Sequence, residues 1–454
     1  MPNRPSRPLS FVCLPLLVIL TGAAGSLYAG PYSAGTHDSN NAFDAPVPGF
    51  VGPDGDGVFS TPTDDGVETH EYYTSVNYVN PLFLGWASSV VSYDPAVKSG
   101  FTPYPEANIL GPVTGNVADI VTLGEPTIVS GEPLPEPGSV TISFDRAICD
   151  LTGADFVVFE NGFEKYDYSG DTFTGLVTAE LAYVEVSTDG VNWARFPSDS
   201  LTESAVGAYG TIDPTNVYNL AGKHVNAFGD VGNASWGTPF DLSALVNEAN
   251  VINGLVELDN ILFVRIVDVP GSGDYLDADG DPIYDGYPSL FGANGADIEA
   301  VGQINIASDF SYWRSFFTLN AELSSSDGDG DRIPLLLEYA FGLDPQHHDK
   351  EPPYKLESVD GLPVFVFRRD VRAHDLTYIV KTSPSLTDPE WTEIARSEAG
   401  GTTTTSLPLE YNVSEASASH INSVQSLVEV RLSLLANLSS DESRYFQVEV
   451  VSAP

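Results

Sequence analysis

The sequence predicts an all-β fold: a jelly-roll-like β-sandwich, a short linker that contains a helix, and a second, smaller β-sandwich. Short runs of β-branched, aliphatic and aromatic residues recur along the chain, and clusters of Gly, Pro, Asn and Asp separate them. Apolar residues at helical spacing are almost absent. Many short strands with few helices are typical of sandwiches.

Changes in composition divide the chain into four parts. Residues 1–29 are predicted to be an export signal, and residues 30–308 a jelly-roll-like domain with a loop-rich N-terminal part. Residues 309–345 form a connector, and residues 346–454 form the smaller sandwich. The chain without its signal is longer than one hydrophobic core usually supports, so more than one domain is expected.

The export signal is recognised by its order of charges and apolar residues. Arg4 and Arg7 precede an apolar run from Phe11 to Leu20, and small residues follow. The run is shorter than the roughly 20 apolar residues of a membrane-spanning helix, and no later segment approaches that length. We therefore expect a secreted or cell-surface protein without membrane insertion.

The charge balance excludes some classes of partner. Asp and Glu number 63 against 19 Lys and Arg, which gives a formal net charge of −44. Such a surface repels nucleic acids and anionic membranes. Removal of the signal leaves Cys149 as the only cysteine, so no intrachain disulfide can form. We expect a monomer whose stability comes from its core or from bound metal.

The strands of the larger domain begin after a loop-rich stretch that ends near residue 135. Asp189-Gly190 predicts the tight turn of a hairpin that runs from Tyr183 to Trp193. Asp241 is expected to cap one short helix that extends to Asn250. The predicted strands are Val140–Phe144, Asp155–Phe159, Leu181–Ser187, Ile261–Val269 and Asp297–Ile306. Ile261–Val269 is almost continuously apolar, which predicts cover on both of its faces.

The second half of the chain repeats this pattern after one helix. Leu335–Phe341 has helical apolar spacing, and Gly342 and Pro345 are expected to end that helix. The predicted strands that follow are Leu362–Phe367, Leu376–Lys381, Val428–Leu434 and Tyr445–Val451.

An acidic stretch directly before that helix has the spacing of a calcium loop. Asp327, Asp329 and Asp331 alternate with glycine, and Glu338 is the twelfth residue counted from Asp327. Calcium is a hard cation that takes six to eight oxygen ligands, so a loop must fold around it while the following helix supplies a last carboxylate. The sequence therefore predicts Ca²⁺ as a cofactor.

The loop departs from the EF-hand pattern at two positions. Position six is Arg332, where a sharp turn usually requires glycine, and position nine is Leu335, which cannot be a ligand. The alternative interpretation is an acidic, solvated linker.

Two further groups of acids are candidate metal ligands. Asp277, Asp279 and Asp281 repeat the alternate spacing but have Pro288 at position twelve, so calcium competes with a solvated loop. Asp297 and Glu299 flank one residue of a predicted strand and should face the same way. Their separation of roughly 6.5–7 Å also overlaps the spacing of catalytic carboxylates in inverting glycosidases.

No nucleophile or zinc-hydrolase motif is present, and the seven histidines are scattered. No catalytic residue is therefore assigned. Tyr275, Tyr284 and Tyr287 lie near the second acidic group, and exposed rings beside carboxylates suit sugar recognition, although core anchoring is their commoner role.

Residues 32–306 resemble a family of bacterial secreted or cell-surface proteins of unassigned activity. The resemblance is carried by Asp155–Phe163, Trp193–Pro197, Asn219–Lys223, Trp236–Leu242 and Ala296–Gly302. It implies a location and no reaction. Leu337–Pro345 resembles the calcium-loop linkers of secreted bacterial proteins, and the C-terminal region is similar to the small β domains that follow such linkers.

Together these observations predict a secreted or cell-surface calcium-binding protein that acts as a non-enzymatic module for glycans or other ligands. One alternative is an extracellular polysaccharide-degrading enzyme that uses paired carboxylates, either Asp297 with Glu299 or Glu160. The other is a structural spacer or a surface protein that captures a nutrient.

Overall fold

The computed structural model describes residues 30–33, 44–51, 78–96, 104–116, 118–226, 235–288, 295–317, 319, 324–349, 352–422, 425–435 and 443–452. The predicted export signal at residues 1–29 lies outside these ranges. Within them, no helix has the length and apolar character needed to cross a bilayer.

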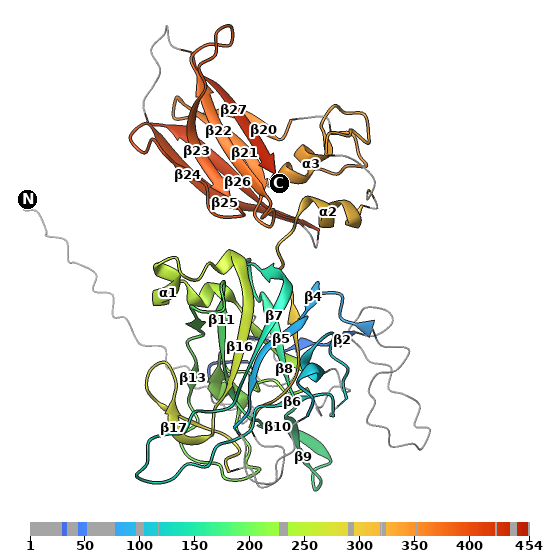
Figure 1. Ribbon diagram of the computed structural model, residues 1–454, viewed down its shortest axis with the longest axis vertical. Helices are drawn as coiled ribbons and strands as arrows, with labels where there is room; N and C mark the ends of the chain where they lie inside the picture. Colours follow the sequence, from blue (N-terminus) through green and yellow to red (C-terminus); the bar gives the residue numbers. More distant parts are fainter. Residues whose placement is uncertain are drawn as a thin grey trace, which may run out of the picture.

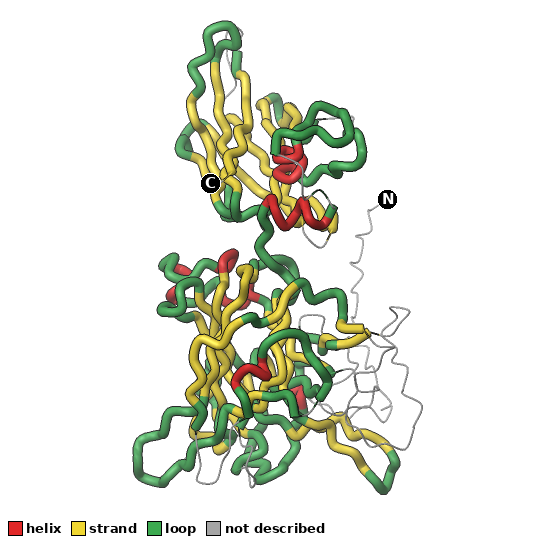
Figure 2. The backbone as a smooth tube through the Cα atoms, turned by 45° about the vertical axis from the view of Figure 1, so that its right-hand side comes forward, coloured by secondary structure: helices red, strands yellow, loops and turns green. Residues whose placement is uncertain are grey.

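The protein is all-β, as the sequence predicts, and its strands form two sandwiches (Figures 1 and 2). The larger sandwich has two main sheets of antiparallel pairs. The first has the order β1 (Val47–Pro48), β15 (Trp236–Phe240), β8 (Phe156–Glu160), β19 (Asp297–Gln303) and β4 (Gly85–Trp86), with β6 (Val121–Thr122) also pairing with β19. The second has the order β12 (Ala194–Arg195), β11 (Ala182–Ser187), β16 (Ile261–Asp268), β7 (Ser139–Ile148) and β5 (Ser89–Asp94). Successive strands such as β7 and β8 lie in opposite sheets.

Shorter elements surround these sheets. The two-stranded pairs are β2 (Phe50–Val51) with β3 (Tyr78–Val79), β9 (Phe163–Asp167) with β10 (Thr172–Thr178), β13 (Asp199–Ser200) with β14 (Val217–Tyr218), and β17 (Ser272–Leu276) with β18 (Pro282–Tyr284). The helical turns are η1 (Glu106–Ile109), η2 (Pro214–Asn216), η3 (Leu242–Leu245), α1 (Ala249–Ile252) and η4 (Leu258–Asn260).

The core of this domain lies between its two sheets. Alternate residues of β7, β8, β11, β16 and β19 point inward, and they include Val140, Ile142, Phe156, Val158, Val184, Val264 and Ile298. The opposite face of β8 is also buried, because Val157 and Phe159 pack against the loop-rich N-terminal part at Phe50, Phe83 and Val113. That part therefore covers the outer face of the first sheet.

The structure refines two expectations for this domain. Burial along β16 alternates, so only one face of this strand is fully covered; on the other face Arg265 pairs with Glu185 and lies over the ring of Trp193. The expected helix after Asp241 is divided into η3 and α1 by Glu248, whose backbone is extended. Asp241 caps η3 as predicted, accepting a hydrogen bond from the amide of Ser243.

The smaller sandwich has two four-stranded sheets. One has the order β20 (Tyr354–Val359), β21 (Leu362–Asp370), β26 (Gln425–Leu434) and β25 (Tyr411–Asn422). The other has the order β24 (Thr404–Thr405), β23 (Thr392–Glu398), β22 (Leu376–Ser383) and β27 (Tyr445–Ser452).

Two helices of the connector, α2 (Phe310–Phe316) and α3 (Leu335–Phe341), complete the core of this smaller sandwich. Trp313 and Tyr339 are fully buried there beside Phe367 and Tyr378. Figure 2 shows both helices against the smaller lobe. The connector is thus part of the C-terminal domain rather than a free linker.

The two domains are joined by a polar junction. The backbone amide of Ser308 donates to the carbonyl of Arg372 at 2.6 Å, and the amide of His374 donates to the carbonyl of Ser308 at 3.2 Å. The guanidinium of Arg372 donates to the side-chain oxygen of Asn305 at 2.9 Å, and the Asn305 amide group donates to Asp155 at 2.7 Å. These backbone and side-chain hydrogen bonds connect the two domains where the chain passes from one to the other (Figure 1).

Candidate metal centre

The acidic loop at residues 327–331 is folded by its own carboxylates. Asp327 accepts hydrogen bonds from the amides of Gly330 at 2.8 Å and Arg332 at 2.9 Å. Asp329 accepts from the amide of Asp331 at 3.1 Å, and Asp331 accepts from that of Ile333 at 2.7 Å. One carboxylate oxygen from each aspartate lies within 4.8 Å of the other two. The three predicted ligands are therefore brought together.

Glu338 faces this loop from α3, one turn after the helix begins. Its exposed fraction is 0%, and neither carboxylate oxygen has a hydrogen-bond partner. Burial, followed by the charges of the neighbouring aspartates, raises the pKa of Glu338 to about 8. A buried carboxylate without a partner is costly, and a cation held by two free oxygens of one glutamate would compensate that cost.

The helix and the loop are fixed to each other by the backbone. The amides of Leu335 and Leu336, which begin α3, donate to the carbonyls of Ser326 at 2.8 Å and Ser324 at 3.1 Å. The first amides of a helix have no hydrogen-bond acceptor within the helix, so they need such partners. The loop therefore closes on the helix that carries Glu338.

Asp349 is an additional candidate ligand that the sequence pattern does not indicate. Its amide donates to Asp331 at 3.1 Å, and its own Oδ2, like the Oδ2 of Asp329, is buried without a partner. Asp349 lies beyond the twelve-residue pattern. It comes back to the loop because α3 ends at Gly342, whose left-handed backbone (φ 63°) reverses the chain.

The two departures from the EF-hand pattern have clear structural roles. Arg332, at position six, has a φ of 75°, so the backbone makes the left-handed turn that glycine usually makes. Leu335, at position nine, is fully buried in the core of the C-terminal domain. The loop thus keeps the required backbone shape without the usual residues.

Replacing Arg332 with glycine is expected to stabilise the protein by up to about 1 kcal/mol, because a side chain in the left-handed region costs about 1–2 kcal/mol and glycine recovers part of it. Gly330 gives the reverse control: its φ is 83° with open space around it, so Gly330→Ala should destabilise the protein by strain alone. Urea unfolding measures both changes. A loss of stability in Arg332→Gly would mean that the arginine side chain contributes more than its backbone costs.

The second acidic cluster forms a hairpin turn rather than a convergent group. Asp277 is buried and accepts hydrogen bonds from the amides of Asp279 at 3.0 Å, Asp281 at 2.8 Å and Ser200 at 3.0 Å. Asp279 and Asp281 are exposed. Among the residues that the structure describes, the three carboxylates do not form a group close enough to share one ion.

Asp297 and Glu299 do not act together in this structure. A register shift between Ile298 and Ala300 places Glu299 in an irregularity of β19. The Glu299 carboxylate accepts from the amides of Thr114 at 2.7 Å and Gly115 at 2.6 Å, so it anchors the loop after η1. Asp297 instead lines a cavity with Glu160 that Glu299 does not line. The pair therefore does not surround one substrate-sized space.

A third acidic group, Asp150, Asp155 and Asp241, lies at the junction of the domains. Asp155 is fully buried, but its oxygens accept hydrogen bonds from the amides of Leu151 and Leu242 and from the side chain of Asn305. These bonds give Asp155 a structural role. The three aspartates of this group are too distant in sequence for a spacing pattern to identify them.

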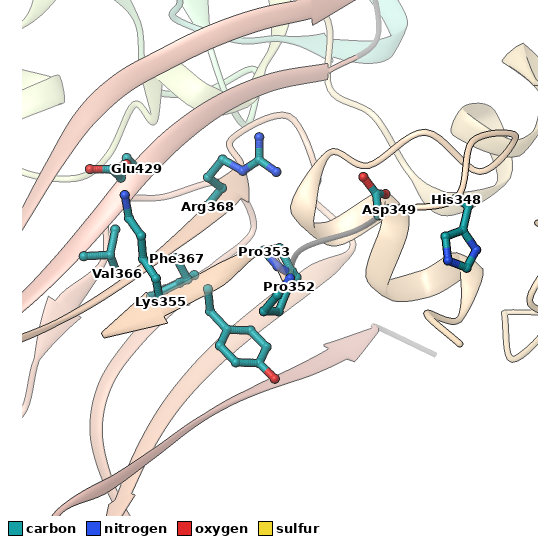
Figure 3. A pocket seen from close by; sticks show the side chains of 10 residues that line it. His348, Asp349, Pro352, Pro353, Lys355, Val366, Phe367, Arg368 and Glu429 are labelled. Carbon is teal, nitrogen blue, oxygen red and sulfur yellow. The ribbon is translucent and has the colours of Figure 1, made fainter. Parts of the chain in front are cut away.

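A pocket of about 510 Å³ adjoins the loop through Asp349. Figure 3 shows Asp349 and His348 on one side and Lys355, Arg368 and Glu429 on the other. Tyr354, which also lines it, is 51% exposed. The pocket thus combines cationic groups, two carboxylates and an accessible ring.

A comparison with protein families found no matching family model, and a search of curated proteins found no match. The resemblance of residues 32–306 to secreted bacterial proteins stays a prediction.

Proposed function

We propose that the protein is an extracellular calcium-binding protein that recognises a polar ligand, such as a glycan, beside the calcium loop of its C-terminal domain. The observation that supports calcium most strongly is Glu338, a fully buried carboxylate with two unpartnered oxygens next to three convergent aspartates. The oxygen-only donor set favours a hard cation, and the number of carboxylates around the loop favours Ca²⁺ over Mg²⁺.

The pocket beside the loop supports the ligand part of this proposal. Asp349 is hydrogen-bonded to the loop and also lines the pocket, so an ion that fixes Asp349 also fixes the pocket wall. Arg368 and Lys355 supply donors for hydroxyl or carboxylate oxygens, and the exposed ring of Tyr354 offers a face for stacking. Binding would then depend on calcium without direct contact between calcium and ligand.

Glycan-array or polysaccharide pull-down measurements test the ligand. Binding is expected to be lost in chelator and weakened about tenfold by Tyr354→Ala, because tenfold corresponds to about 1.4 kcal/mol and ring contacts contribute about that amount. Leu409→Ala, at a residue 92% exposed and outside the pocket lining, is the matched control. Ligand binding that persists in chelator, or that is unchanged by Tyr354→Ala, would contradict the assignment of this pocket.

A further inference from the structure

The first described residues of the chain, 30–33, are bound to the larger domain. They follow the predicted export signal directly and contact η2 and β14. The backbone amide of Tyr32 donates to the carbonyl of Thr215 at 3.1 Å, and the ring of Tyr32 stacks on that of Tyr218 with 4.9 Å between their centroids. Ser33 is 1% exposed. This segment is therefore part of the fold of the larger domain.

Gly30, at the start of this segment, occupies a place that fits only glycine. A Cβ built on Gly30 would lie 2.0 Å from the carbonyl oxygen of Thr215 and 2.5 Å from Oδ1 of Asn216. Glycine is the residue that allows a backbone to come so close to another backbone. Gly30 is thus held directly against η2.

Two side-chain oxygens lie next to Gly30. Its nitrogen donates to Oγ1 of Thr215 at 3.1 Å, and the Thr215 hydroxyl donates in turn to Asp213 at 2.7 Å. Oδ1 of Asn216 lies beside Gly30 and accepts no hydrogen bond from the residues that the structure describes. Within a longer chain, the amide of Gly30 has a single hydrogen to donate to these oxygens.

The negative charge at this place has no cation of its own. Among the described residues, Asp213 forms no ion pair with a lysine or arginine. Lys223, whose charge acts on Asp213, is buried and paired with Asp44. A positive charge at Gly30 would therefore be attracted to Asp213.

We propose that export processing cuts the bond between Ala29 and Gly30, and that the new amino terminus binds Thr215, Asn216 and Asp213. A signal peptidase adds water across this peptide bond, so Ala29 keeps the new carboxylate and Gly30 gains an amine that is protonated at neutral pH. The ammonium group has three hydrogens for the two oxygens, and its charge is one hydroxyl group away from Asp213. Charge-assisted hydrogen bonds are stronger than neutral ones.

The fit of Gly30 also selects one cleavage site among several. Small residues stand at positions 23–25 as well as at Ala29, so the sequence pattern allows an earlier cut. An earlier cut would leave extra residues before Gly30 and no ammonium group beside Thr215. The proposal rests on the extracellular location proposed above, but not on calcium or on the ligand.

Intact mass spectrometry of the exported chain tests the cleavage site. The measured mass is expected to match a chain that begins at Gly30. A chain that begins at another residue, or that keeps its signal, would overturn the proposal.

Calorimetry of purified chains tests the binding of the amino terminus and does not depend on export. In the chain that begins at Gly30, the transition of the larger domain is expected about 2–4 °C higher than in a chain that keeps Tyr28 and Ala29. The longer chain has a neutral amide in place of the ammonium group. Equal melting of the two chains would overturn the proposal.

The same pair of chains with Asp213→Asn and Asn216→Ala is the matched control. Asparagine at position 213 still caps η2, so the fold is kept while the charge and the second oxygen are removed. The difference between the short and the long chain is expected to disappear. A difference of unchanged size would overturn the proposal, because it would show that the amino terminus acts elsewhere.

Discussion

Trp313→Ala is expected to destabilise the C-terminal domain by about 3–5 kcal/mol, the usual cost of removing a large buried aromatic side chain. Trp313 is 0% exposed and its ring contacts those of Phe310, Phe317 and Tyr339. Because a domain is typically stable by about 5–15 kcal/mol, this loss should lower its melting transition strongly. Differential scanning calorimetry of the full chain measures it.

Two control variants test whether the loss of stability is specific to the buried ring of Trp313. Trp391→Ala removes a partly exposed tryptophan from the same domain and should have a smaller effect. Trp313→Phe keeps most of the apolar volume and removes an indole N–H that has no partner, so it should cost much less than alanine. Unchanged melting of Trp313→Ala would mean that the connector is an independent linker, as its composition suggests.

Removal of calcium is expected to have the second largest effect. Calcium at a free concentration one hundred times its dissociation constant would stabilise the folded protein by about 2.7 kcal/mol. Chelator should remove that contribution. The effect should appear in the C-terminal domain, because the loop closes on α3 and α3 is part of that core. Calorimetry with and without chelator locates the shift.

Glu338→Gln isolates the contribution of the loop. In this variant, the melting transition of the C-terminal domain should no longer shift with calcium, because α3 has lost its charged ligand. Glu390→Gln, at an exposed glutamate of the same domain, should respond as wild type does. A full calcium response in Glu338→Gln would show that stabilisation arises elsewhere.

Local pattern predicted most of the strands and the helix of the loop. The predicted helix Leu335–Phe341 has the same bounds as α3, because apolar spacing, Gly342 and Pro345 all indicate them. The positive φ expected at Gly190 is found, at 74°, but the hairpin is wider than predicted, because β11 pairs with β12 beyond Trp193 and a loop rather than a tight turn joins the two strands. These features depend on neighbouring residues alone.

Features that depend on contacts distant in sequence were beyond such reasoning. Trp313 has no local sign that it enters the C-terminal core, and Asp349 joins the loop only after the chain turns back. Asp297 and Glu299 look equivalent on an ideal strand, but a register shift gives them different surroundings. Glu160 and Asp297 meet because β8 and β19 are neighbours in a sheet, which spacing cannot reveal.

The placement of the loop changes what calcium would do in this protein. A loop within a flexible linker would stiffen the junction between domains. Here the loop, α2 and α3 belong to the C-terminal sandwich, and the junction is formed by Ser308, Arg372 and Asn305. Calcium is therefore expected to complete one domain and its adjoining pocket.

The most direct test of calcium binding at the loop is the number of calcium ions that Glu338→Gln binds compared with wild type, measured by equilibrium dialysis at neutral pH. Our account predicts that the variant binds one ion fewer while Glu390→Gln binds the wild-type number. Equal numbers of ions in wild type and Glu338→Gln would contradict it.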